Sequence, residues 1–183
     1  CTVNKELSVL RAMFVKAMEW AYISTNPTAK LKNLTDDSVV HDRYLKSKEL
    51  DRLLNAAMAQ QEHVFPNMAE FIVVAINTGL RLSEALSLPI AHVNFTERVL
   101  SVKNKPTKRT KNGSERHIRF NQDTYDALVK LRQKAVNRFG TILQKPDGSS
   151  WLPAKRILHE QFRECVKAAG LYCEDPTQNV TIH

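Results

Sequence analysis

Residues suited to phosphate chemistry occur in three places along the chain. Arg81 follows a Thr-Gly-Leu sequence at the end of an apolar run, and Glu84 comes three residues later. A guanidinium donates two parallel hydrogen bonds to a phosphate, and a carboxylate behind it can hold it in place. The other two places are a lysine-rich stretch that begins at Lys103 and the Thr-Ile-His sequence that ends at His183. Taken alone, Arg81 could equally form a structural salt bridge.

Positive charge is concentrated in one segment. The chain carries a net charge of +8, and the segment Lys103–Arg119 holds seven basic residues against one acid, Glu115. A concentration of this kind suits a polyanion, because neutralised phosphates release their counterions. A solvated basic loop is the alternative explanation.

Several other kinds of chemistry lack their motifs in this sequence. There is no G-x-x-x-x-G-K-[ST] phosphate loop, and H-E-x-x-H fails because Arg163 stands four residues after His159. We therefore expect neither a metal site nor a cofactor. The three cysteines form no C-x-x-C pair, which favours a reducing cytoplasm. No apolar run approaches the roughly 20 residues of a membrane span.

The hydrophobic pattern predicts mostly helices. The expected helices run from about Thr2 or Asn4 to the Asn26-Pro27 pair, and then over Ser47–Ala59, Met68–Asn77, Leu82–Leu88, 122–138 and 154–169. Two β-prone runs, Val99–Val102 and Arg116–Phe120, predict a hairpin whose connection carries the basic charge. The expected fold class is therefore mainly α with a small antiparallel β-sheet (α+β). A polar stretch without periodicity at 36–43 predicts a linker.

Four segments resemble the tyrosine recombinases, the family of the phage-type integrases. Thr78–Leu88 reads T-G-L-R-L-S-E-A-L-S-L and is similar to their first active-site box, T-G-[LM]-R-x-x-E-x-x-x-L. Lys111–Ile118 resembles the hairpin box K-[TN]-G-x-x-R-x-V, although Arg119-Phe120 stands where Pro-Leu is usual. The final Thr-Ile-His resembles the start of the T-x-H-x-L-R-H box. The first helix resembles the pattern T-x-N-x-E-L-S-x-L-R-x-x-F of the core-binding domain, beginning at Thr2.

This resemblance implies a domain organisation and an activity. Residues 1–35 would be the C-terminal part of a helical, DNA-binding core-binding domain, 36–43 a linker, and 44–183 a catalytic domain that is incomplete at its C-terminus. In this family a tyrosine attacks a DNA phosphodiester, forms a 3′-phosphotyrosyl link and releases a 5′-hydroxyl. The full-length protein is therefore expected to be a DNA strand-transferring recombinase of a phage or other mobile element. It would carry out site-specific DNA recombination or integration at double-stranded attachment sites, as a homo-tetramer on DNA.

The resemblance also assigns roles to individual residues. Arg81 would bind a non-bridging phosphate oxygen, with Glu84 as its support. Lys111 would protonate the leaving 5′-oxygen, and Lys108 and Lys105 are the alternatives for this role. His183 would take part in acid–base chemistry or hold the phosphate. Contacts with backbone phosphates are expected from Lys103, Lys105, Lys108, Arg109 and Arg116.

The nucleophile of this family lies beyond the T-x-H box. Tyr22, Tyr44, Tyr125 and Tyr172 all precede His183, so none occupies that place. We therefore expect the 183 residues alone to be inactive. One alternative is a DNA-binding module without catalysis, in which replacing Arg81 would change DNA affinity little. Another is a structural protein whose basic loop meets an acidic protein or RNA, with no preference for duplex DNA.

Overall fold

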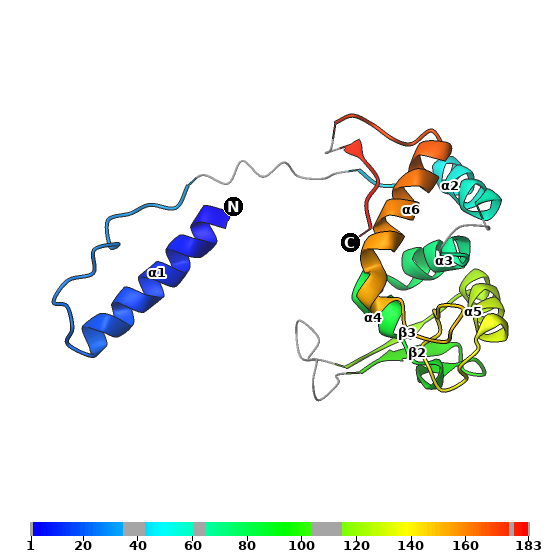
Figure 1. Cartoon of the computed structure of the whole chain (residues 1–183), viewed down its shortest axis with the longest axis horizontal. Coiled ribbons are helices and arrows are strands. Elements are labelled where there is room, and N and C mark those ends of the chain that lie inside the picture. Colours follow the sequence, from blue (N-terminus) through cyan, green and yellow to red (C-terminus); the bar gives the residue numbers. More distant parts are fainter. Residues whose placement is uncertain (1, 35–42, 61–64, 104–114, 176–177, 183) are drawn as a thin grey trace. The chain divides into compact units, whose positions relative to one another are not determined.

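The computed structural model describes residues 2–34, 43–60, 65–103, 115–175 and 178–182. The chain divides into two compact units, Cys1–Asp42 and Arg43–His183, and each is described by itself. The prediction of a mainly helical chain with a small antiparallel sheet is confirmed (Figure 1). The assignment of 1–35 to a core-binding domain and of 44–183 to a catalytic domain stays a prediction.

Helix α1, Thr2–Glu19, begins the first unit. The prediction that this helix reaches the Asn26-Pro27 pair is wrong. Ala21 adopts a left-handed φ of 58°, and the Tyr22 N–H donates to the Ala17 carbonyl at 2.9 Å. The Tyr22 N–H thus satisfies a carbonyl in the last turn of the helix. The helix therefore ends several residues before Pro27.

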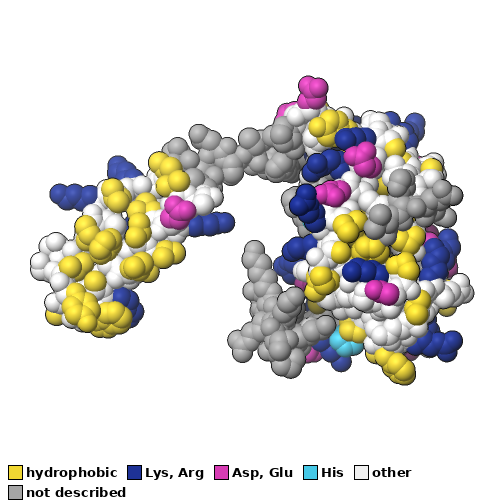
Figure 2. Space-filling view, in the orientation of Figure 1, with side chains coloured by type: hydrophobic (Ala, Val, Ile, Leu, Met, Phe, Trp, Pro, Cys, Tyr) yellow, Lys and Arg dark blue, Asp and Glu magenta, His cyan; other side chains and the backbone are white. Residues whose placement is uncertain are grey.

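The chain after α1 folds back and is bonded to the helix. The Asn4 amide donates to the Leu34 carbonyl at 2.9 Å and accepts from the Leu34 N–H at 2.8 Å. Within the described part of this unit, no side chain of α1 is buried. Val9 is 60% exposed and Met13 is 61% exposed, and Figure 2 shows such hydrophobic side chains gathered on the surface of this unit. Its own residues therefore leave an apolar helix face uncovered.

Helix α3 lies at the centre of the second unit. The helices of this unit are α2 Ser47–Ala59, α3 Met68–Thr78, α4 Leu82–Ser87, α5 Gln122–Lys134 and α6 Lys155–Ala168, with 3-10 turns η1 Ile90–His92 and η2 Leu152–Ala154. Helix α3 packs against α2, α4 and α5, while α6 packs against α2. Phe71, Ile72 and Val74 of α3 are almost fully buried, as expected for a helix that is apolar on most sides.

Helix α2 has its predicted bounds, whereas α5 ends before the predicted residue 138. The buried side chain of Gln144 explains the early end. Its carbonyl oxygen accepts the Asn137 N–H at 2.9 Å, and its amide donates to the Thr141 carbonyl at 2.7 Å. The Gln144 side chain therefore pairs with backbone groups of the loop after α5, which another helical turn would otherwise have to pair.

The sheet has three antiparallel strands in the order β1-β2-β3, namely β1 Val93–Asn94, β2 Val99–Val102 and β3 Arg116–Arg119. The two-residue strand β1 was not predicted. Leu100 pairs with Ile118, and Val102 pairs with Arg116. The connection from β2 to β3 therefore leaves the sheet at Val102, and the turn from β1 enters it at Val99. Among the described residues, no helix is long and apolar enough to cross a membrane.

The start of α2 supplies a prediction about pH and stability. The Arg43 guanidinium donates to both oxygens of Glu49, at 2.9 and 3.0 Å. These bonds, and the Lys46 N–H that Glu49 also accepts, lower the pKa of Glu49 from 4.5 to about 2. A lowered folded-state pKa stabilises the fold above the unfolded pKa. We expect Glu49→Gln to lower Tm near neutral pH, and the difference from wild type to shrink between pH 4.5 and about 2.

A thermal melt at each pH measures this difference. Glu164→Gln is the matched control, because Glu164 also pairs with a cation but its side chain is 58% exposed. The control should change Tm little at any pH. A Tm difference for Glu49→Gln that stays constant down to pH 2 would contradict the assigned role of Arg43.

Candidate functional site

The turn between α3 and α4 presents Arg81 outward. Gly79 ends α3 with a left-handed φ of 60°, and its N–H donates to the Ala75 carbonyl. Leu80 and Leu82 on either side of the arginine are buried, at 5% and 8% exposed. The Arg81 side chain is 45% exposed. Two buried leucines therefore hold the backbone while the guanidinium between them faces solvent.

Glu84 fixes Arg81 at both its backbone and its side chain. The Glu84 carboxylate accepts the Arg81 backbone N–H at 2.9 Å and an N–H of the Arg81 guanidinium at 3.0 Å. The first bond satisfies a backbone donor at the start of α4, where helices leave N–H groups unpaired. The second bond joins the two side chains that stand three residues apart in the sequence. The Glu84 side chain is only 11% exposed.

Glu84 also binds a second arginine, Arg116 of β3. The Arg116 Nη2 atom donates to the Glu84 carboxylate at 2.6 Å. Alternation along β3 puts Arg116 on the same face as Ile118, toward the buried side of the sheet, and the paired residue Val102 is buried there. This contact was not predicted from the sequence, although the spacing of Arg116 from Ile118 indicates that its side chain points inward.

The three side chains together form a cationic cluster around one carboxylate, which we call the Glu84 cluster (Arg81, Glu84 and Arg116). The Arg116 side chain is 35% exposed, so both arginines reach solvent. Each guanidinium has five N–H donors, and one carboxylate occupies only some of them. The cluster keeps a net positive charge and can bind an anion with planar, directed donors.

The other predicted site residues lie near this cluster or outside the described residues. Lys103 is exposed and follows Val102, whose strand partner is Arg116. Lys105, Lys108, Arg109, Lys111 and His183 lie outside the residues that the structure describes. The arrangement of all these residues as one catalytic and DNA-binding site stays a prediction.

The end of the described chain lies beside the turn that carries Arg81. Val180 and Ile182 line a cavity of about 280 Å³ together with Gly79, Leu80 and Leu82. Both residues also pack against the hydrophobic core. Residues 180–182 and the turn at 79–82, far apart in the sequence, therefore meet in the fold.

A metal centre is not indicated in the part of the chain that the structure describes. No group of three or more His, Cys, Asp or Glu side chains there could hold a metal ion. Cys165 is buried, its Sγ lies 3.2 Å from the side-chain oxygen of Gln60, and burial raises the pKa of its thiol. A buried thiol of this kind packs as a small apolar residue.

Residues 43–183 match the model of the phage integrase family. This match covers most of the chain, so the protein belongs to the phage integrase family, the tyrosine recombinases that its sequence resembles.

Curated relatives come from bacteria and their transposons. The chain is 26% identical to a putative integrase/recombinase of Haemophilus influenzae, over all of this chain and 46% of that protein. It is 25% identical to the transposase of transposon Tn916 from Enterococcus faecalis, over all of this chain and 49% of that protein. The chain thus spans about half the length of these relatives.

Solved structures show the same fold. The Tn1549 transposon integrase in complex with transposon right end DNA has a TM-score of 0.74 and 21% identity, over 95% of this chain and 60% of that one. A lambda integrase dimer bound to a core site has a TM-score of 0.68 and 19% identity, over 92% of this chain and 56% of that one.

The Glu84 cluster predicts a stability effect that depends on Arg116. Glu84→Gln keeps the shape but removes the charge that holds two guanidinium groups, so it should lower the free energy of unfolding by about 1–3 kcal/mol. In a double-mutant cycle with Arg116→Gln, the two changes should not add, with a coupling of about 0.5–3 kcal/mol. Urea unfolding of the four proteins measures both quantities.

Glu164→Gln is the control, because it also removes a carboxylate from an ion pair but at an exposed position. Its effect should stay within about 0.5 kcal/mol. Strict additivity of Glu84→Gln and Arg116→Gln would show that the contact between them does not stabilise the fold.

Proposed function

We propose that this chain is part of a site-specific tyrosine recombinase that cleaves and rejoins DNA through a 3′-phosphotyrosyl intermediate. The observation that carries the proposal is the Glu84 cluster, in which a shared carboxylate orients Arg81 at the start of α4 and Arg116 at the start of β3. Membership of the phage integrase family supports it. The whole enzyme, rather than these residues alone, would perform the reaction.

The cluster suits the transition state of phosphoryl transfer. Negative charge grows on the non-bridging oxygens as the nucleophile attacks, and fixed cationic donors stabilise this state more than the ground state. Arg81 would bind one of these oxygens, and Glu84 holds its guanidinium so that little reorganisation is needed. We propose Arg116 as a phosphate contact whose guanidinium is oriented by the same carboxylate.

Lys111 and His183 would complete the chemistry. Lys111 would protonate the leaving 5′-oxygen, with Lys108 and Lys105 as alternatives, and His183 would serve in acid–base chemistry or bind the phosphate. The packing of Val180 and Ile182 beside Gly79 and Leu80 supports a place for the Thr-Ile-His segment near Arg81. Lys103, Lys105, Lys108 and Arg109 would contact backbone phosphates, which position the duplex without reading its sequence.

The nucleophilic tyrosine would come from outside the present sequence. Tyr125 packs against Phe95 and lies under Arg98, near the end of the sheet opposite Arg116. The Tyr172 ring contacts the Lys167 ammonium at 5.8 Å. All four tyrosines of the chain precede His183, whereas the nucleophile would follow it, so we expect the 183 residues alone to be inactive.

The partner would be double-stranded DNA at attachment sites, and the full-length protein would assemble on it as a tetramer. The lambda integrase, which shares the fold, has been solved as a tetramer bound to a Holliday junction. Action on bacterial or phage DNA would place the protein in the cytoplasm. We propose that the chain's own residues provide the positive charge and the protons, without a cofactor.

The first test is to trap the covalent intermediate with the full-length protein that contains this chain. The substrate is a duplex attachment site with a nick close to the cleavage point, so that the short strand carrying the released 5′-hydroxyl dissociates. Without this hydroxyl the cleavage cannot reverse, and the covalent protein–DNA adduct should accumulate. Arg81→Ala should lower the rate of adduct formation about 10²–10³-fold, the loss expected for one transition-state donor. Denaturing gel electrophoresis with labelled DNA measures this rate.

Two controls accompany this measurement. Arg163→Ala removes an exposed arginine of α6 that is far from Arg81 in the sequence and should leave the rate unchanged. The 183-residue chain alone should give no adduct. If the full-length protein binds the site but forms no adduct, the protein is a DNA-binding module without catalysis, and our proposal is wrong.

The basic connection between β2 and β3 should determine how DNA binding depends on salt. Replacing Lys105, Lys108 and Arg109 together by glutamine should reduce the slope of log K against log salt concentration by about 0.9 for each lost phosphate contact. Fluorescence anisotropy with a labelled duplex, at several salt concentrations, measures the slope. The matched variant replaces Lys130, Lys155 and Arg163, which removes the same charge from α5 and α6.

The two triple variants separate a located interface from a general effect of net charge. An equal loss of slope in both would mean that no particular surface binds DNA. A weak salt slope in the wild type, with no preference for duplex over single-stranded RNA, would favour a structural protein with a different acidic partner.

A further inference from the structure

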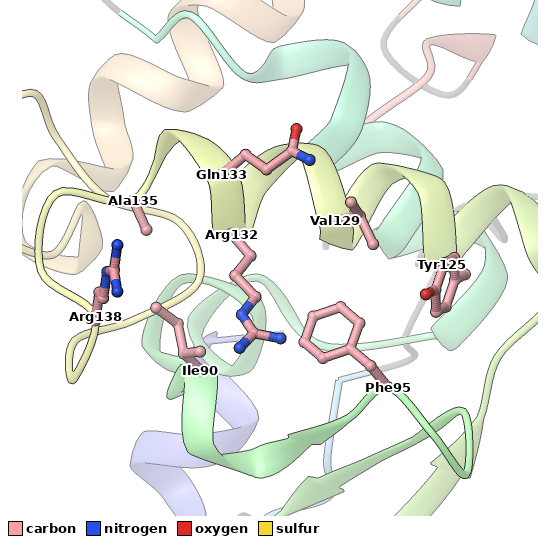
Figure 3. A pocket seen from close by; sticks show the side chains of 8 residues that line it. All are labelled: Ile90, Phe95, Tyr125, Val129, Arg132, Gln133, Ala135 and Arg138. Atoms are coloured by element: carbon pink, nitrogen blue, oxygen red, sulfur yellow. The ribbon is translucent and has the colours of Figure 1, made fainter.

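A cleft of about 610 Å³ lies beside α5 (Figure 3). Tyr125, Val129 and Arg132 line it from one side of that helix, at spacings of four and three residues. Ile90 of η1 and Phe95, which follows β1, line the cleft from the opposite side. The apolar side chains are half-buried and form the floor, while the exposed Arg132 reaches between Ile90 and Phe95.

Two arginines line this cleft, and a third, Arg98, contacts the ring of Tyr125, which also lines it. Arg132 lies over the Phe95 ring at 5.0 Å, and Arg98 lies over the Tyr125 ring at 5.1 Å. Arg138 lines the cleft from the loop after α5. Within the described residues, none of these arginines forms an ion pair with a carboxylate. The cleft therefore holds positive charge that no carboxylate of the described residues pairs with.

The charge is not explained by helix capping alone. Arg132 is in the last turn of α5, where the helix dipole favours a cation. Arg138, however, lies beyond the end of that helix. Arg98 adopts a left-handed φ of 52°, an unusual backbone for an arginine, while its guanidinium contacts Tyr125.

The loop after α5, which supplies Arg138 to the cleft, also carries exposed apolar side chains. Phe139 is 97% exposed and Val136 is 66% exposed. The loop that carries them is held against the cleft, because the Gly140 carbonyl accepts the Ile90 N–H at 3.0 Å. Large apolar side chains exposed next to a polar rim are typical of surfaces that bind another protein.

The cleft lies at the other end of the sheet from the Glu84 cluster. Phe95 and Arg98 belong to the turn that enters β2 at Val99, whereas Arg116 pairs with Val102 at the far end of that strand. None of the residues that line the cleft belongs to the Glu84 cluster. The cleft is thus a separate surface of the second unit.

We propose that this cleft, the Arg132–Arg138 cleft, binds an acidic peptide segment of a partner protein. An apolar side chain of the peptide would lie on the floor formed by Ile90, Phe95 and Val129, and flanking carboxylates would bind Arg132 and Arg138. Arginine binds a carboxylate through two parallel hydrogen bonds. The volume of the cleft lies within the range of about 300–1,000 Å³ that is usual for ligand sites.

A peptide fits these features better than a nucleic-acid backbone does. A phosphodiester chain carries charge but offers no apolar group to remove Ile90, Phe95 and Val129 from water. Burial of apolar area is what stabilises a complex at such a floor. The proposed role does not require the chain to belong to an active recombinase.

The experiment uses three rhodamine-labelled peptides and the 183-residue chain. The first peptide is Ser-Asp-Glu-Leu-Phe-Glu-Asp-Ser, the second has amides in place of its carboxylates, and the third has Ser-Gly in place of Leu-Phe. Fluorescence anisotropy should show saturable binding of the first peptide and at least about tenfold weaker binding of the other two. This result would show that binding requires both the carboxylates and the Leu-Phe anchor of the peptide.

Charge reversal at the cleft locates the binding. Arg132→Glu and Arg138→Glu should each weaken binding of the first peptide at least about tenfold. Arg138→Glu lies outside α5, so it is informative even if Arg132→Glu destabilises the helix end. The control Arg163→Glu reverses an exposed arginine on α6 and should leave the affinity unchanged.

Binding of a duplex DNA is measured with the same variants. We expect Arg138→Glu to weaken peptide binding, while its affinity for the duplex DNA falls no more than that of Arg163→Glu. It is overturned if the first peptide does not bind, if all three peptides bind equally, or if the arginine variants leave its affinity unchanged. A selective loss of DNA binding in Arg138→Glu would instead make the cleft part of the nucleic-acid surface.

Discussion

The second unit depends on one shared carboxylate, that of Glu84. A carboxylate that is only 11% exposed is costly unless cations and hydrogen-bond donors surround it. Glu84 meets this requirement with the Arg81 backbone N–H and with the guanidinium groups of Arg81 and Arg116. The start of α4, the exposed arginine and the last strand of the sheet are therefore fixed to one another by a single side chain.

Simple local rules bring these residues to one place. Gly79 takes the left-handed conformation that ends α3, and buried Leu80 and Leu82 orient the backbone around Arg81. Alternation along β3 turns Arg116 toward the buried face together with Ile118. Neither rule involves charge. The ion pairs form because backbone conformation has already placed the groups within reach, which limits the entropy lost when they associate.

The sequence predicted most of the elements, because their periodicity is strong. Helix α2 has its expected bounds, and the link between Arg81 and Glu84 follows from their spacing of three residues. The errors lie where a tertiary or local bond competes with periodicity. A left-handed Ala21 ends α1 early, the buried Gln144 ends α5 early, and strand β1 has only two residues and no pattern of its own. No run or motif in the sequence indicates that Arg116 lies against Glu84, since they are distant in the chain.

Charge is likewise only partly visible in the sequence. The run from Lys103 to Arg119 is contiguous and is easily seen, whereas Arg98, Arg132 and Arg138 are scattered and meet only when α5 packs over the turn after β1.

The two basic regions also hold their arginines differently. A carboxylate, as in the Glu84 cluster, fixes a guanidinium but neutralises part of its charge. An aromatic ring holds a guanidinium while leaving its full charge for another group, and it adds an apolar surface beside that charge. The first arrangement suits a DNA phosphodiester, whose two non-bridging oxygens share one negative charge, and the second suits a ligand that carries both a carboxylate and an apolar side chain.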